Sequence, residues 1–127
     1  MTWSVLVFFA GPTPLGLVVA GVAEIQAPTD AVHICDALGW PRCTQSVEQR
    51  TLTLRNEQYR TQLVVDGPVA VRTLLPAQLT RPPRGIDAGV LACVISDGTP
   101  TVLVLDLNVL LARLQFAAPP TLQAGAL

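Results

Sequence analysis

The first apolar segment of the chain is hydrophobic at both odd and even positions, rather than at alternate ones. Residues 5–9 are all apolar, as expected of a strand that is buried on two faces or lines a small barrel. Turn-forming residues occupy 11–14, and the mostly apolar segments 15–19 and 22–25 follow before Pro28. The pattern predicts a central first strand and, with the turn and the segments that follow, an opening hairpin.

A second apolar run, 31–35, predicts another short strand. Asp36 follows it directly and is expected to cap a single helical turn. Gly39 and Pro41 would end that turn, because both residues disfavour helix continuation. The sequence therefore predicts a strand, an aspartate cap and a short helix in this region.

The middle of the chain has the clearest alternation of polar and apolar residues. After a polar connection over 42–49, residues 51–55 predict a half-exposed strand that forms a hairpin with 59–65. Asp66-Gly67-Pro68 is expected to interrupt the second strand of that hairpin. The apolar segment 69–75 then resumes, with Val69 and Val71 on one face.

The last third of the chain predicts a third hairpin followed by a helix. Segments 90–95 and 101–105 flank an Asp97-Gly98 step, which is a strong turn signal. Asp106 is expected to cap a closing helix. The apolar side of this helix would consist of residues at helical spacing, namely Leu107, Leu110, Leu111 and Leu114.

The two halves of the chain share one order of elements, a hairpin and then an apolar strand that leads through Asp into a Leu-containing helix. We therefore predict a mainly β domain over 1–115, built as two small barrels over about 1–45 and 46–115, and a flexible tail over 116–127. The first barrel is expected to be incomplete, because only residues 26–30 stand where the second half has a strand. An incomplete barrel exposes a sheet edge that a loop, a second copy or a partner must cover.

Composition narrows the range of functions. The chain has 127 residues, of which 50% are hydrophobic and 13% are charged, a balance typical of a folded domain. Its net charge is −1, with acidic and basic residues scattered singly, so there is no basic stripe for a phosphate backbone. We expect no nucleic-acid partner. The three cysteines, an odd number at wide spacing, indicate reduced and buried thiols in the cytoplasm.

Residues 2–23 carry no charge, and they are apolar enough to raise the alternative of a membrane span. A signal peptide would have basic residues near Met1, and there are none. A spanning helix would not favour the prolines of the 11–14 turn at its centre. Two strands explain the segment better, so we predict a cytoplasmic protein with no membrane insertion.

Few residues suggest catalysis or metal binding. His33 and Cys35 could form a metal or nucleophile site with Asp36, but adjacent residues on the expected strand would point to opposite faces. The chain also contains only one histidine. Asp36, Asp66 and Asp106 each follow an apolar strand, where capping or turn formation is the ordinary role. We therefore expect no catalytic residue, no metal and no cofactor.

Four segments together resemble the CheW family of chemotaxis coupling proteins. Residues 62–71 resemble its strand, turn and strand around Val-Asp, and 22–25 resemble its Val-x-Glu-Ile step. Residues 33–39 are similar to its Val-Ile-Asp-Leu-x-x-Leu-Gly step, and 89–111 to its C-terminal hairpin and helix. The resemblance implies two intertwined SH3-like barrels that form a noncatalytic scaffold.

The resemblance also implies partners, namely the cytoplasmic domain of a chemoreceptor (a methyl-accepting chemotaxis protein), a CheA-type histidine kinase, or another CheW-like protein. The first barrel would face a receptor or a dimer mate through Val22, Glu24 and Ile25; Glu24 is the sole charge among the first 29 residues. The second barrel would contact a kinase regulatory domain or another adaptor through Leu63, Val65, Asp66, Val69 and Val71.

The chain departs from the family pattern in one place. The family's Gly-Val-Ile-Asn-Leu-Arg-Gly segment should lie between Ile25 and Val32, and it is missing. An adaptor that binds one partner only is therefore one alternative. A self-assembling β protein that uses the open edge is another, and a small-ligand-binding barrel is a third.

Overall fold

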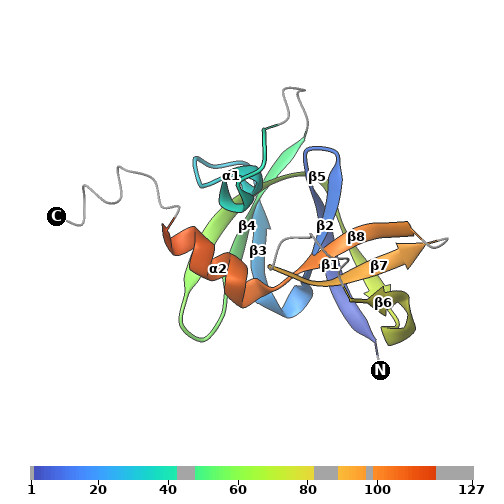
Figure 1. Cartoon of the computed structure of the whole chain (residues 1–127). Coiled ribbons are helices and arrows are strands. Elements are labelled where there is room, and N and C mark those ends of the chain that lie inside the picture. The colour runs from blue at the N-terminus through green and yellow to red at the C-terminus, as the bar shows by residue number, and fades with distance from the viewer. Residues whose placement is uncertain (1, 43–47, 82–88, 97–98, 117–127) are drawn as a thin grey trace.

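A single antiparallel-rich sheet with short helices against it forms the computed structural model, which describes residues 2–42, 48–81, 89–96 and 99–116 (Figure 1). The sheet order is β3-β4-β5-β1-β2-β8-β7-β6. Its strands are β1 (Trp3–Ala10), β2 (Thr13–Val18), β3 (Val22–Gln26), β4 (Gln49–Arg55), β5 (Arg60–Leu74), β6 (Leu79–Thr80), β7 (Val90–Ser96) and β8 (Thr99–Leu105). The helices are α1 (Ile34–Leu38) and α2 (Leu107–Phe116), with 3-10 turns at Val19–Gly21 and Pro76–Gln78.

β1 lies in the middle of the sheet, between β2 and β5. Its two faces belong to two separate groups of buried side chains: Val5 packs in the smaller group, and Leu6 and Phe8 pack in the larger one. Because neighbouring residues of a strand point to opposite faces, the all-apolar run is explained by a core on each side. The prediction of a strand buried on both faces is confirmed.

β5 changes its neighbour halfway along its length. From Arg60 to Asp66 it pairs with β4, and from Asp66 to Leu74 it pairs with β1. The predicted interruption at 66–68 is therefore wrong, because the strand continues through it. Asp66-Gly67-Pro68 marks the point where pairing with β4 ends and pairing with β1 begins.

The mainly β fold is confirmed, and the sheet is not closed, since it ends at β3 and at β6. The larger core group lies between the sheet and the two helices, whereas the smaller one joins β1 and the end of β5 to β7 and β8. Both groups contain residues from before and after position 45. The two core groups are therefore not separated at the boundary expected near residue 45, and that boundary stays a prediction.

The prediction of a strand over 31–35 is wrong, because α1 already begins at Ile34. Extended structure here is limited to one bridge between His33 and Val64. His33, not Asp36, is the N-cap residue, and Asp36 lies exposed within the helix. The end of α1 was predicted correctly, since Gly39 follows the helix in the left-handed conformation with φ 74°.

The C-terminal predictions are confirmed where the structure describes them. β7 and β8 pair as an antiparallel hairpin. Asp106 caps α2, and its Oδ1 accepts hydrogen bonds from the backbone N–H of Asn108 (2.9 Å) and Val109 (3.2 Å). The helix is held to the core by its buried apolar side, made up of Leu110, Leu111 and Leu114.

Other predictions are settled only in part. Cys35 and Cys93 are buried as expected, and burial raises the pKa of the Cys93 thiol. Cys43, the Asp97-Gly98 turn and the tail beyond Phe116 lie outside the described residues. Neither helix of the described chain has both the length and the apolar character needed to cross a membrane.

Candidate functional site

Two side chains that are 33 positions apart in sequence meet in the interior. The Nε2 atom of His33 lies 3.0 Å from Oδ1 of Asp66, and both residues are less than 5% exposed. His33 comes from the N-terminal end of α1, and Asp66 comes from the point where β5 changes its neighbour. The pair therefore joins the first helix to the middle of the sheet.

The hydrogen bonds around His33 define its tautomer. Its Nδ1 accepts a hydrogen bond from the backbone N–H of Cys35 at 3.1 Å, so Nδ1 carries no proton. In the neutral ring the proton is then on Nε2, which donates to the Asp66 carboxylate. One imidazole thus caps α1 and binds β5 at the same time.

Asp66 accepts two further hydrogen bonds besides the one from His33. The backbone N–H of Gly11 donates to Oδ2 at 2.7 Å, and the side-chain amide of Gln49 donates to Oδ1 at 3.4 Å. Burial by itself would raise the pKa of Asp66, but the hydrogen bonds and the proximity of His33 lower it below its ordinary value. Asp66 is therefore a charged, fully satisfied carboxylate that ties the β1–β2 turn and β4 to the junction.

His33, Cys35 and Asp66 also form a group whose potential ligand atoms lie within 4.8 Å of one another. The third member of this group is Asp66 from β5, and not the exposed Asp36 that the sequence suggested. The argument from strand faces does not apply here, because α1 begins at Ile34. A neutral histidine that binds a metal through Nε2 carries its proton on Nδ1. Here Nδ1 accepts the Cys35 N–H, so the arrangement fits a structural junction and does not fit a metal ion.

Three of the residues expected to contact a partner are in the interior. Leu63 and Val65 are 0% exposed and belong to the larger core group, and Asp66 is 3% exposed. Their side chains form the core and the junction, so they do not present a surface. This corrects the expectation of direct contact: all residues of β5 from Leu63 to Asp66 are buried, so this stretch of the strand is covered on both faces.

The other five expected residues lie at or near the surface, in two places. On the end strand β3, Val22 is half-buried, Glu24 is exposed and Ile25 is 46% exposed. On the second half of β5, Val69 packs partly against the larger core group, while Val71 is 61% exposed. We call these the β3 surface and the β5 surface.

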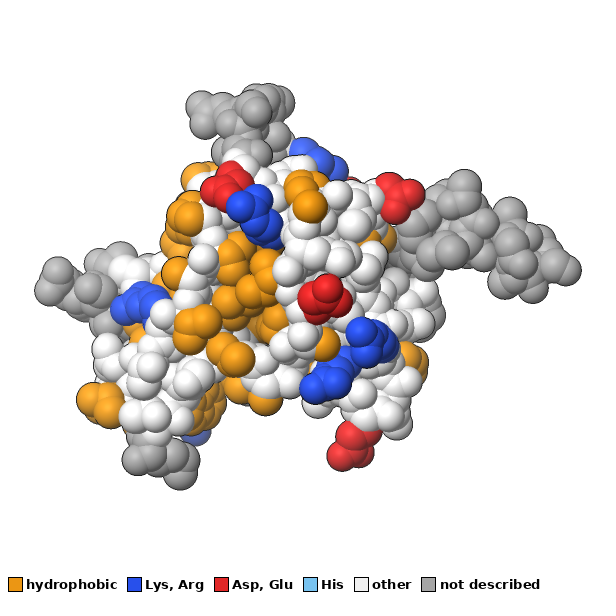
Figure 2. Space-filling view, turned by 180° about the vertical axis from the view of Figure 1, so that it is seen from behind, with side chains coloured by type: hydrophobic (Ala, Val, Ile, Leu, Met, Phe, Trp, Pro, Cys, Tyr) orange, Lys and Arg blue, Asp and Glu red, His pale blue; other side chains and the backbone are white. Residues whose placement is uncertain are grey.

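Apolar side chains also gather at the surface on one side of the molecule. Figure 2 shows hydrophobic side chains gathered in a hollow in the middle of the side opposite to the view of Figure 1, with basic and acidic side chains around it. Patches of this kind mark protein–protein or membrane interaction sites or ligand-binding grooves.

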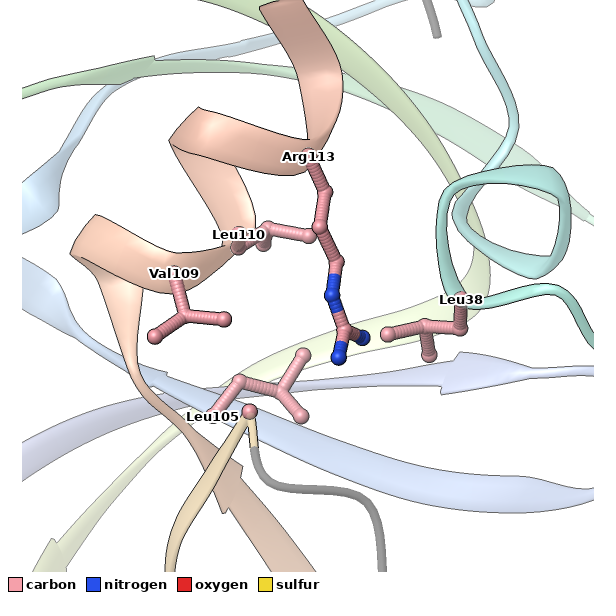
Figure 3. Close-up of a pocket in the computed structure, with 6 residues that line it drawn as sticks. Leu38, Leu105, Val109, Leu110 and Arg113 are labelled. Carbon is pink, nitrogen blue, oxygen red and sulfur yellow. The ribbon is translucent and has the colours of Figure 1, made fainter. Parts of the chain in front are cut away.

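A pocket between the two helices bears on the alternative of a small ligand. Leu38 from α1 and Arg113 from α2 point towards each other across it, above Leu105 (Figure 3). Its walls leave no space even for a water-sized molecule, whereas sites for drug-sized ligands commonly span about 300–1,000 Å³. The pocket offers one charged group and no converging polar set, so it does not favour the ligand-binding alternative.

The contact between His33 and Asp66 was not predicted from the sequence. Asp66 was expected to form a turn, and His33 was placed on a strand, so nothing connected the two. One signal was available, because the chain repeats an apolar-polar-apolar step at 32–34 and at 105–107, and in the second copy the polar residue is the cap Asp106. By that comparison His33, and not Asp36, corresponds to the cap.

The fold and the surfaces together define a β-rich domain with an open sheet and exposed apolar side chains. Among solved structures, the chain is similar to the scaffolding protein TtCheW from Thermoanaerobacter tengcongensis, with a TM-score of 0.67. The match covers 87% of this chain and 92% of that one, at 16% sequence identity. No protein-family model matches the sequence, and no curated protein matches it either. The comparison therefore shows a shared CheW-like fold.

Proposed function

We propose that this protein is a noncatalytic adaptor of a bacterial chemosensory pathway. Its partners would be a chemoreceptor cytoplasmic domain, a CheA-type histidine kinase or another CheW-like protein, and it would act in the cytoplasm. The observation that carries the proposal is the fold shared with a scaffolding protein over nearly the full length of both chains. The resemblance of residues 62–71 and 89–111 to the CheW pattern supports it independently.

The exposed residues fit that role. Val71 is more than half exposed in a strand whose other apolar residues are mostly buried. An exposed valine contributes little to the core of the monomer, so a role in contact with a partner accounts for it better. We assign the β5 surface to the kinase regulatory domain or a second adaptor. We assign the β3 surface, with Glu24 and Ile25, to the receptor.

The experiment is co-purification of the full chain with the receptor cytoplasmic domain and the CheA-type kinase of its own organism, with a complete CheW as positive control. Binding to at least one of the two supports the adaptor role. Binding to the receptor alone would identify a specialised component that is not coupled to the kinase. Binding to neither, while the control binds both, would refute the proposal.

A second candidate function is self-association through the end strand β3. In the described chain β3 pairs with β4 on one side only, and open strand edges are templates for pairing with another chain. Light scattering over a range of protein concentrations tests this candidate. A mass that rises with concentration, and that Ile25→Lys returns to the monomer value, would favour it over the adaptor role.

A further inference from the structure

Two arginines stand directly opposite each other at the end of the β4–β5 ladder. Arg55 and Arg60 are the last register pair of that hairpin, and both are exposed. Arg55 follows the buried Leu54, whose side chain faces the larger core group. Because neighbouring strand residues face opposite sides, both arginines are on the outer face of the sheet.

The positive charges of this pair are not neutralised within the part of the chain that the structure describes. The ion pairs found there involve His33, Arg42 and Arg50, and neither Arg55 nor Arg60 contacts a carboxylate. Like charges directly opposite each other on paired strands are destabilising. The hairpin therefore carries a local electrostatic cost that an anion bound between the two side chains would relieve.

The turn that joins the two arginines is held in place by the rest of the fold. The Asn56 side-chain oxygen accepts hydrogen bonds from the backbone N–H of Gln58 (2.8 Å) and Tyr59 (2.7 Å). Its side-chain amide donates to Asn108 at the start of α2, at 2.9 Å. The backbones of Arg55 and Arg60 are thus fixed relative to each other before any ligand arrives, which reduces the entropic cost of binding.

We propose that Arg55 and Arg60 together bind the carboxylates of an acidic segment in a protein partner. Two adjacent guanidinium groups match the geometry of carboxylates through paired N–H donors. The next row of the same face contains Glu24, opposite Thr53, which in turn pairs with Gln62. An acidic segment that also contains a basic residue matches both rows.

Glu24 is the reason for preferring a polypeptide over a polyanion. It would repel the uniform negative charge of a nucleic acid or an anionic lipid surface. The chain as a whole has a net charge of −1, and on the side of the molecule shown in Figure 2 basic and acidic side chains are scattered with no large patch of one sign. Exposed Tyr59 adds an aromatic residue next to Arg60, and Tyr and Arg are both enriched at binding hot spots.

This inference goes beyond the proposed function, since it does not depend on which protein is the partner. The probe is a short capped peptide with two adjacent glutamates and one lysine, added to the isotope-labelled full chain in low salt while backbone amide NMR shifts are recorded. A matched peptide with glutamines in place of the glutamates is the control ligand. We expect saturable shifts at Arg55 and Arg60 with the first peptide and none with the second.

The variants Arg55→Gln and Arg60→Gln are compared with Arg72→Gln, which removes an exposed arginine elsewhere on β5. Each of the first two is expected to weaken peptide binding roughly three- to tenfold, and the third to leave it unchanged. Because each substitution also relieves repulsion, the melting temperature is expected to rise by about 1–4 °C. An equal loss of binding in all three variants, or a lower melting temperature in the first two, would overturn the proposal. Tighter binding to phosphatidylserine vesicles than to the acidic peptide would also overturn it.

Discussion

The imidazole of His33 donates to the carboxylate of Asp66 across 3.0 Å in the interior, and through its other nitrogen it caps α1. This contact brings the β1–β2 turn, α1, β4 and β5 to one point, because Asp66 also accepts hydrogen bonds from Gly11 and Gln49. Asp66 is the residue at which β5 changes from one neighbouring strand to the other. The pair therefore positions the elements whose outer surfaces are the proposed binding sites.

Replacing Asp66 with Asn removes the negative charge and exchanges one acceptor oxygen for an N–H₂ group, which then faces groups that are themselves hydrogen-bond donors. We expect a loss of about 2–4 kcal/mol in the free energy of unfolding, because buried donors lose their acceptor. Asp36→Asn is the matched control, since Asp36 is exposed and forms one surface ion pair with Arg42, and it should cost about 0.5 kcal/mol or less. Urea denaturation of the two variants checks this. Equal stability of both variants would show that the junction contributes nothing.

The dependence of stability on pH follows from the lowered pKa of Asp66. A carboxylate with a pKa below its unfolded value stabilises the fold fully above that unfolded value, which is about 3.9 for Asp. The contribution is lost as the pH falls through the lower folded pKa. We therefore expect the stability difference between the wild type and Asp66→Asn to be constant near neutral pH and to shrink below about pH 4. A difference that stays constant down to pH 3 would contradict the assignment.

The two roles of His33 can be separated by substitution. Asn is a good helix cap but lacks the ring that reaches Asp66, whereas Ala provides neither contact. His33→Ala is expected to cost about 1 kcal/mol more in the free energy of unfolding than His33→Asn. Thermal or urea denaturation gives both values. If Asn and Ala are equally destabilising, the ring does not act as the cap of α1.

Elements that are determined by residues close together in sequence could be predicted, whereas elements that depend on distant strands could not. The two-faced apolar run of β1 and the Asp106-capped α2 follow from nearby residues, so patterning predicted both. The long β5 could not be foreseen, because its continuity through Asp66-Gly67-Pro68 depends on a second strand, β1, that is distant in sequence and takes over the pairing.

The prediction of where α1 begins was wrong for a different reason. The run over 31–35 has the composition of a strand. Asp36, directly after this run, is also a more usual N-cap residue than a histidine, so the helix was expected to begin later than it does. Leu63 and Val65 were placed at the surface by resemblance, although an uninterrupted apolar run such as 63–65 is typical of a buried strand. The surface positions of Glu24 and Ile25 agree with the expectation of an incomplete barrel with an open sheet edge, since β3 is an end strand of the sheet.

The β5 surface yields a stability prediction that separates binding from folding. Val71 is 61% exposed, so Val71→Arg should change the free energy of unfolding by about 0.5 kcal/mol or less. Its effect on binding should be large, because a charge would be placed in the middle of an apolar contact. Leu75→Arg, at another exposed apolar residue outside the proposed surface (54% exposed), is the matched control.

The central claim is tested most directly by measuring the affinity of the full chain for the CheA-type kinase and the receptor cytoplasmic domain, with Val71→Arg and Leu75→Arg alongside the wild type. We predict that the wild type and Leu75→Arg bind at least one of these partners equally well, and that Val71→Arg weakens kinase binding by about tenfold or more. No binding of the wild type to either partner, or equal binding by all three proteins, would contradict the assignment of this chain as an adaptor that uses its β5 surface.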